Sequence, residues 1–198
     1  SGIGMLTAGV SVSGIAQRMF AGVDSFSYLA IPMFMLAGKL MEYGGISARI
    51  VQVAKILCAK VRGGLAITSI VACSFFAALS GSAPATVSAI GGIMYPEMLK
   101  DGYDEEFAGG MISVAGNLGP LIPPSILMVT IGVCTGVSIS DMFLGGIVIG
   151  ILLAAVFCLT AYVICRRRNY GGSGQTYSSK EKWRIFWSAM PALGMPII

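Results

Sequence analysis

Three hydroxyl side chains lie close together in the middle of a long uncharged run. Ser80, Ser82 and Thr86 fall within LSGSAPATVSAIG, where Gly81 separates the two serines. Hydroxyl and carbonyl oxygens at interrupted helices bind sodium in membrane transport proteins. The residue types and spacing therefore predict a small-cation site, with the hydroxyls of Ser80, Ser82 and Thr86 and nearby carbonyls as candidate sodium ligands.

A second polar interruption, GNLGPLIPPS, lies in the middle of the next uncharged run. Its prolines lack the backbone N–H that a regular helical hydrogen-bond ladder needs. The amide oxygen of Asn117 and the nearby carbonyls offer further oxygen ligands for the same cation. The second interruption is therefore part of the predicted sodium site.

Interrupted helices expose main-chain dipoles of both signs. Free carbonyls at the end of one half-helix attract a cation, and free N–H groups at the start of the next attract a carboxylate. In hydrocarbon each unsatisfied group costs several kcal/mol, so such backbone persists only where protein or a wet cavity covers it. A carboxylate site beside the cation is therefore predicted. Its candidate contacts are Ser82, Ala83, Pro84, Thr86, Pro123, Pro124 and Ser125.

Other chemistry is weakly supported. Small residues also let membrane helices pack closely, and Gly146 and Gly150 in GIVIG indicate that role alone. Two polar interruptions in tandem favour a binding site over packing. The serines lack a G-x-S-x-G context and the chain has no histidine, so an enzyme is not predicted. The acidic stretch EMLKDGYDEE lacks calcium-loop spacing and predicts a solvated cytoplasmic loop.

The composition is that of a membrane protein. Of the 198 residues 56% are hydrophobic and only 11% charged, against about 25% charged in soluble domains. The five cysteines form no C-x-x-C pair and predict no disulfide framework. The predicted fold class is an all-α integral membrane protein, a polytopic helix bundle. Nucleic acid is not an expected partner.

Charges and uncharged runs divide the chain into four parts. The predicted parts are scaffold transmembrane helices with an interfacial amphipathic helix (1–62), a transport-type unit (63–140), a transmembrane helix (141–168), and a cytoplasmic linker with the start of a further membrane segment (169–198). Both ends of the chain look cut, which suggests a piece of a longer protein.

Topology follows from the basic residues. Lys55, Lys60, Arg62 and the Arg166–Arg168 cluster mark the cytoplasmic side, so the number of crossings between them is even. The last apolar run supplies one crossing. One interrupted run therefore crosses once, and the other turns back within the membrane. The short segment after the first interruption favours a hairpin there, but the opposite assignment also satisfies the parity.

Several motifs in order resemble the large membrane subunit of TRAP (tripartite ATP-independent periplasmic) transporters. They are AIPMFMLAGKLMEYGGIS, RGGLAITSIVACSFFAALSGSAPATVSAIG, GYDEEFAGGMISVAGNLGPLIPPSILM and SISDMFLGGI, and the likeness extends over residues 1–165. The resemblance implies one half of an inverted-repeat transporter, with a re-entrant hairpin at 63–96 and a broken transmembrane helix at 105–137. It also implies a first sodium site at the hairpin tip and the following turn, formed by Ser80, Gly81, Ser82, Asn117, Gly119 and Pro120. The family often has a second serine at the tip, where this chain has Ala83 and Pro84.

The resemblance also implies a function. Family members are multi-pass proteins of the bacterial inner membrane that import carboxylates, such as C4-dicarboxylates or sialic acids, with sodium as the coupling ion and no organic cofactor. A periplasmic solute-binding protein delivers the substrate, and a small membrane subunit completes the complex. The hairpin unit would move against scaffold helices in residues 1–41. The alternatives are an ion-coupled anion carrier without a binding protein, and a structural membrane subunit without a transport site.

Overall fold

A computed structural model describes residues 43–58 and 61–170, together with isolated positions between 13 and 40 and at 183 and 185. The predicted scaffold helices of residues 1–41 and most of the predicted linker lie outside the described residues. Every regular element within 43–58 and 61–170 is a helix. The helices are α4 (Ile46–Cys58), α5 (Gly64–Ser80), α6 (Ala83–Lys100), α7 (Glu105–Gly116), α8 (Ile126–Thr135) and α9 (Ile139–Arg167).

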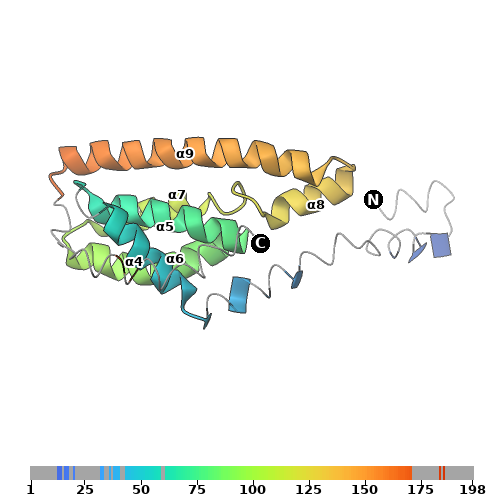
Figure 1. The fold of residues 1–198 in the computed structure, drawn as a ribbon, viewed down its shortest axis with the longest axis horizontal. Coiled ribbons are helices and arrows are strands. Elements are labelled where there is room, and N and C mark those ends of the chain that lie inside the picture. Colours follow the sequence, from blue (N-terminus) through green and yellow to red (C-terminus); the bar gives the residue numbers. More distant parts are fainter. Residues whose placement is uncertain are drawn as a thin grey trace.

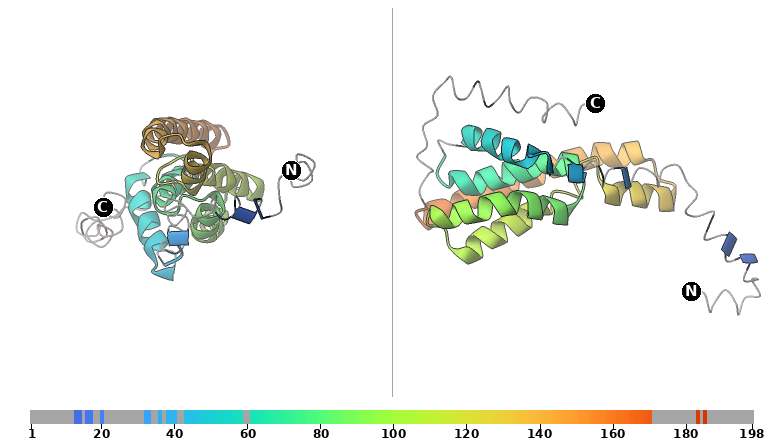
Figure 2. Two further views of the ribbon diagram at one scale, coloured as in Figure 1. Left: turned by 90° about the vertical axis from the view of Figure 1, so that its right-hand side faces the viewer. Right: turned by 90° about the horizontal axis from the view of Figure 1, so that it is seen from below.

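Helix α5 lies at the centre of the bundle and packs against α4, α6, α7 and α9. This position explains why α5 carries no charged residue and has no polar face. Ile70, Cys73, Phe76 and Ala77 are almost fully buried and form part of the core. Figures 1 and 2 show the helices running nearly side by side, with α9 along one side of the others.

The two interrupted runs fold differently. Helices α5 and α6 run in opposite directions and pack along each other, so the first run turns back at Gly81 (Figure 1). Helices α7 and α8 follow one another in the same sense along α9. The sequence left this assignment open, and the chain direction now distinguishes the two runs. The all-helical class is confirmed for the described residues.

The returning arm of the hairpin is longer than the expected 63–96. Helix α6 continues through Pro96 to Lys100. Proline removes one hydrogen bond from the ladder, but tertiary contacts hold the last turn. Met98 is fully buried, and Glu97 Oε2 lies 2.5 Å from Lys55 Nζ of α4.

Helix α9 is long and apolar enough to cross a membrane, and it alone among the described helices meets both criteria. Its 29 residues extend over about 42 Å at about 1.5 Å per residue. Helix α8 packs on its first half. A Cβ atom on Gly146 would lie 2.6 Å from the Met128 Cε, and one on Gly150 would lie 2.7 Å from Ile122 Cγ1. These contacts fit the close packing predicted for GIVIG.

The predicted amphipathic helix is α4, and it packs on α5 and α6. In the sequence, Ile46, Ile50, Val53 and Leu57 follow one another at helical spacing and predict an apolar stripe. Ile50 and Val53 are buried and Arg49 is exposed, as this stripe predicts, but Leu57 is 63% exposed. The position of α4 relative to a membrane interface stays a prediction.

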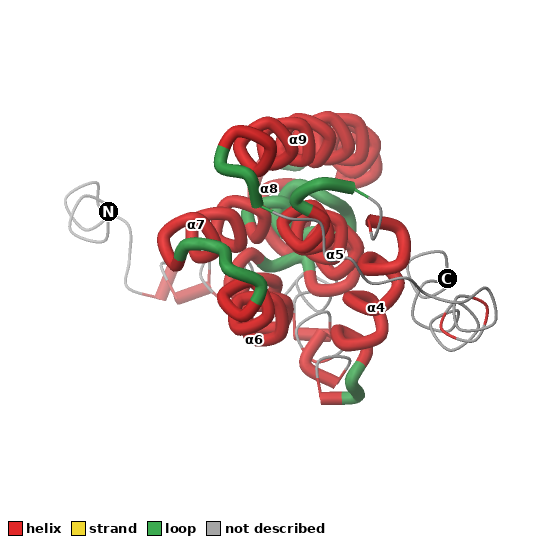
Figure 3. The backbone as a smooth tube through the Cα atoms, turned by 90° about the vertical axis from the view of Figure 1, so that its left-hand side faces the viewer, coloured by secondary structure: helices red, strands yellow, loops and turns green. Residues whose placement is uncertain are grey.

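The ends of α6, α7 and α9 meet at one end of the bundle (Figure 3). Asp104 Oδ2 accepts a hydrogen bond from Arg168 Nη1 at 2.8 Å and another from the Tyr170 hydroxyl. Tyr103 and Tyr170 stack with their ring centroids 4.6 Å apart, and burial raises the pKa of the Tyr103 hydroxyl. The predicted acidic loop is therefore a short turn, with Asp101 and Asp104 exposed.

Candidate ion and substrate site

The first interruption is a tight turn of Gly81 and Ser82 between α5 and α6. Gly81 ends α5 in the left-handed conformation, with φ 59° and ψ 15°, and its N–H donates to the Ala77 carbonyl at 2.9 Å. A residue with a side chain is strained there, which explains the glycine. The predicted helix end at this glycine is confirmed.

The hydroxyl groups of the tip bond to one another. Thr86 Oγ1 donates to the Ser82 carbonyl at 2.8 Å and lies 3.0 Å from Ser80 Oγ. Because the Thr86 hydroxyl donates its one proton to the Ser82 carbonyl, the Ser80 hydroxyl is the donor in its hydrogen bond with Thr86. Ser80 Oγ can in turn accept from the Ser82 N–H, 3.4 Å away. Thr86 is fully buried and Ser80 is 5% exposed, so these bonds satisfy polar groups that water scarcely reaches.

Ser82 occupies the N-cap position of α6, as predicted, but its side chain makes no capping hydrogen bond. Its backbone is extended, with φ −136° and ψ 126°. Pro84 lies in the first turn of α6, where a missing N–H costs little. The side chain of Ser82 therefore remains available for another contact.

The two interruptions touch through glycine. A Cβ atom on Gly81 would lie 2.5 Å from the Pro124 carbonyl oxygen, and one on Gly119 would lie 2.7 Å from the Ser82 carbonyl carbon. The Gly119 Cβ would also lie 2.8 Å from the Ala83 nitrogen. The structure thus brings Gly81, Ser82 and Ala83 against Gly119 and Pro124, residues that the sequence assigned to one site.

Gly116 also belongs to this contact, although the sequence analysis did not select it. Its Cβ would lie 2.1 Å from Val87 Cγ2 and 3.5 Å from the Ala83 carbonyl oxygen. Gly116 ends α7 and is buried, with Val87 and Ala83 of α6 beside it. Its position as the first residue of GNLGPLIPPS was the available signal.

Four helix ends converge at this contact. Helices α5 and α7 end here, and α6 and α8 begin here: a Cβ on Gly81 would lie 3.1 Å from the Ile126 nitrogen. The carbonyls of Gly119, Pro120 and Pro124 accept no hydrogen bond from any donor in the described part of the chain. Helix C-termini favour cations and helix N-termini favour anions, so both kinds of ligand find a complementary dipole.

Other predicted site residues lie elsewhere or are already engaged. The Asn117 side chain is exposed and donates to the Ser113 carbonyl at 3.4 Å. Ser125 is fully buried, and its Oγ accepts from the Met128 N–H at 3.4 Å as the N-cap of α8. Pro84 is exposed. The structure therefore favours backbone groups over these side chains at the point of contact.

Known proteins match this chain over nearly its whole length. The family model of the tripartite ATP-independent periplasmic transporter DctM component matches residues 3–198. The C4-dicarboxylate TRAP transporter large permease protein DctM of Vibrio cholerae is 49% identical over 160 residues, which are 80% of this chain and 35% of that protein.

Relatives named for other substrates match as well. The sialic acid TRAP transporter large permease protein SiaM of Vibrio cholerae is 34% identical over 98% of this chain and 45% of its own length. The isethionate TRAP transporter permease protein DctMQ of Oleidesulfovibrio alaskensis is 39% identical over 93% of this chain and 29% of its own length. The chain spans less than half the length of these relatives. It belongs to the DctM family, the large permease component of tripartite ATP-independent periplasmic transporters.

Proposed function

We propose that the complete protein is the permease of a sodium-coupled importer of organic acids in the bacterial inner membrane. A periplasmic solute-binding protein delivers the substrate, and a small TRAP membrane subunit completes the complex. C4-dicarboxylates are the first substrates to test, because a relative named for them is 49% identical. Relatives named for sialic acid and isethionate extend the screen to other organic anions.

The convergence of four helix ends at Gly81 and Gly119 supports a binding site here. Chain reversal between α5 and α6 fits a re-entrant hairpin, and the α7–α8 interruption fits a broken transmembrane helix. Polar backbone in the middle of a membrane requires a protein or aqueous environment. A transport site at this depth supplies that environment on one side, and the bundle supplies it on the other.

Sodium and the carboxylate take different parts of the contact. Sodium is assigned to the carbonyl-rich side, with Ser80, Gly81 and Ser82 at the tip. Asn117, Gly119 and Pro120 provide the facing oxygens. The substrate carboxylate is assigned to the N-terminal ends of α6 and α8. The candidate substrate contacts there remain Ser82, Ala83, Pro84, Thr86, Pro123, Pro124 and Ser125.

The hairpin and the broken helix move together in the proposed mechanism. Gly81, Gly116 and Gly119 leave no room between the tip and the facing backbone, so neither part can slide past the other without unpacking. Alternating access then requires the whole unit to move against scaffold helices, in an elevator-like or rocking motion. Residues 1–41 are the candidates for that scaffold.

Uptake by the reconstituted complex tests this function. Proteoliposomes containing the complete permease and the small subunit receive labelled substrate loaded on the binding protein. We expect uptake with an inward sodium gradient and at most background uptake when potassium replaces sodium. Equal uptake without sodium would remove the coupling from the proposal.

Two controls distinguish the alternatives. Uptake of free substrate at full rate without the binding protein would identify an independent anion carrier. A double variant, Ser82→Ala with Asn117→Ala, tests the structural-subunit alternative. If the folded double variant and a folded Gly119→Ala variant both support undiminished transport by the complex, the proposed site is wrong.

A further inference from the structure

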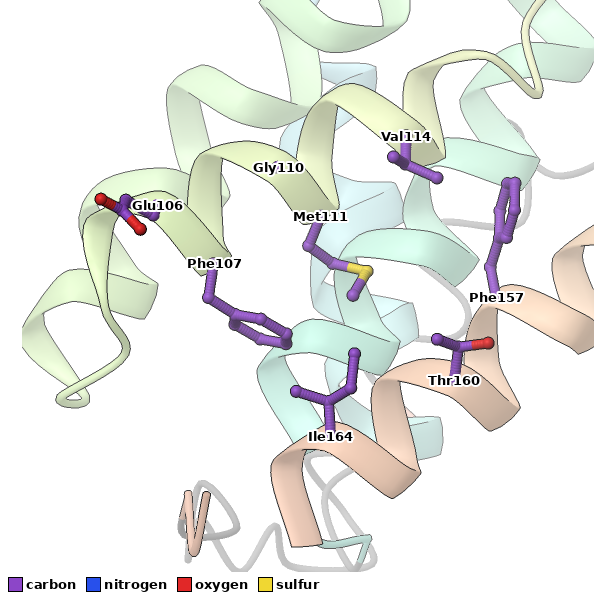
Figure 4. Close-up of a pocket in the computed structure, with 8 residues that line it drawn as sticks. All are labelled: Glu106, Phe107, Gly110, Met111, Val114, Phe157, Thr160 and Ile164. Carbon is purple, nitrogen blue, oxygen red and sulfur yellow. The ribbon is translucent and has the colours of Figure 1, made fainter. Parts of the chain in front are cut away.

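An open groove of about 280 Å³ lies between α7 and α9, and the proposed transport function does not use it. Figure 4 shows Phe107 and Met111 of α7 projecting toward Ile164 and Thr160 of α9. Val114 and Phe157 line the other end of the groove. Its walls are almost wholly apolar, although the groove is open to the surroundings.

The deep end of the groove, at Phe157, lies about the depth of one membrane leaflet from Arg168. Phe157 precedes Arg168 by 11 positions, which correspond to about 16 Å of helix. Half of a hydrocarbon core of about 30 Å is about 15 Å. The groove extends no further because α7 ends at Gly116. A transmembrane helix needs a face about twice as long, whereas an acyl chain of one leaflet needs this length.

Charges of both signs lie at the end of the groove near the surface. Glu106, in the first turn of α7, lines the groove. The guanidinium carbon of Arg168 lies 6.0 Å from the centroid of the Phe107 ring, which also lines it. Arg168 Nη1 contacts Asp104, and the guanidinium carries five N–H donors, so it can contact a phosphate as well. Arg167 beside it is exposed.

We propose that this groove binds one phospholipid of the cytoplasmic leaflet whose headgroup joins a phosphate to a primary ammonium. One acyl chain lies between Phe107 and Phe157, the phosphate contacts Arg168, and the ammonium contacts Glu106. An anionic headgroup without an amine meets unfavourable charge from Glu106 and Asp104. A choline headgroup has no N–H to donate to the Glu106 carboxylate.

Gly110 provides a direct test of the acyl-chain position. It is exposed in the wall of the groove, and a Cβ atom on it would meet nothing within 4 Å. Gly110→Leu therefore fills the groove without disturbing the backbone, and leucine is a better helix former than glycine. Gly145 of α9 is equally open but lies outside the groove, so Gly145→Leu is the matched control.

The experiment measures lipid retention by the complete permease, purified and stripped of lipid in detergent. The protein is incubated separately with palmitoyl-oleoyl phosphatidylethanolamine, phosphatidylglycerol and phosphatidylcholine, and bound lipid is counted by native mass spectrometry. We expect preferential retention of one phosphatidylethanolamine molecule, with apparent affinity reduced about tenfold or more by Gly110→Leu and unchanged by Gly145→Leu. Glu106→Gln should abolish the preference for the ethanolamine headgroup without abolishing lipid binding.

Three results would overturn the proposal. Equal retention by the Gly110→Leu and Gly145→Leu variants would place the lipid elsewhere. A preference of the unaltered protein for phosphatidylglycerol or phosphatidylcholine would contradict the headgroup assignment. Efficient cross-linking of Thr160→Cys to another polypeptide in the membrane would show that a protein segment covers the groove instead.

Discussion

The two helix interruptions differ in chain direction and in how their polar groups are hydrogen-bonded. Between α5 and α6 the chain reverses within Gly81 and Ser82, and the hydroxyls of Ser80 and Thr86 bond to each other and to the Ser82 carbonyl. Between α7 and α8 the chain continues in the same direction through a longer segment, residues 117–125. The first interruption satisfies the hydroxyl groups of Ser80 and Thr86 internally. In the second, the carbonyls of Gly119 and Pro120 accept no hydrogen bond from a donor in the described part of the chain.

This difference indicates that the two interruptions contribute different numbers of ligands to the proposed sodium site. In the hairpin tip the hydroxyl protons of Ser80 and Thr86 are already committed to hydrogen bonds within the tip. The carbonyls of Gly119 and Pro120 have no donor in the described part of the chain and are better placed to exchange a ligand. We therefore expect the 117–125 segment to contribute more backbone oxygens to sodium than the tip does. Substitutions at the two interruptions test this division.

The largest effect is expected where the two interruptions touch. Gly119→Ala places a Cβ atom 2.7 to 2.8 Å from backbone atoms of Ser82 and Ala83, which cannot rotate away. Overpacking of this kind costs about 1–3 kcal/mol. We expect a lower thermal unfolding midpoint and nearly complete loss of sodium-driven uptake in proteoliposomes.

Gly92→Ala is the matched control for that substitution. Gly92 lies in α6, and its added Cβ would meet nothing within 4 Å. Its unfolding midpoint should be equal or higher, because alanine favours a helix over glycine by up to about 1 kcal/mol. Equal behaviour of the Gly92 and Gly119 variants would mean that the tip and the second interruption are not in contact.

A smaller but clear effect is expected inside the tip. Thr86→Val keeps the shape but removes the hydroxyl that donates to the Ser82 carbonyl, leaving buried Ser80 with a poorer partner. Loss of a partner for a buried polar group costs about 1–3 kcal/mol. We expect a lower unfolding midpoint and a weaker apparent affinity for sodium, while Thr86→Ser retains both. A Thr86→Val protein as stable as its parent would contradict the hydrogen-bonded tip.

The next effect is expected from substitution of Asn117. Its side chain is exposed, and within the described part of the chain it donates one 3.4 Å hydrogen bond to the Ser113 carbonyl, so Asn117→Ala should change stability little. If its amide oxygen turns to sodium during transport, the sodium concentration for half-maximal uptake should rise about tenfold or more, because losing one polar contact to a charged group costs about 1.5–3 kcal/mol. Sodium titration of uptake measures this. An unchanged half-maximal concentration would restrict the site to backbone oxygens.

The smallest effect is expected at the opposite end of the hairpin. Asp104→Asn weakens an exposed ion pair with Arg168, and exposed pairs contribute little in water. Uptake and the unfolding midpoint should remain close to those of the parent protein at physiological salt. A loss of uptake as large as that of Gly119→Ala would show that this polar end, rather than the interruptions, controls the movement.

Some features could be predicted from local sequence. Gly81 marked the end of α5, and the uninterrupted apolar run around Gly146 became the long helix α9. The end of α6 could not be predicted, because Pro96 suggests a stop that buried Met98 and the Lys55–Glu97 ion pair override. Contacts between residues that are distant in the sequence decide such boundaries. Hydrophobic periodicity is a local pattern and does not predict those contacts.

Composition and the backbone chemistry of glycine and proline were enough to predict the membrane character, the positions of both interruptions and the oxygen-rich residues around them. The packing of the helices established which run reverses and which continues. It also decided that Gly119 faces Ser82, while the Asn117 side chain points to its own helix. Those outcomes depend on the free space that neighbouring helices leave, which no local pattern specifies.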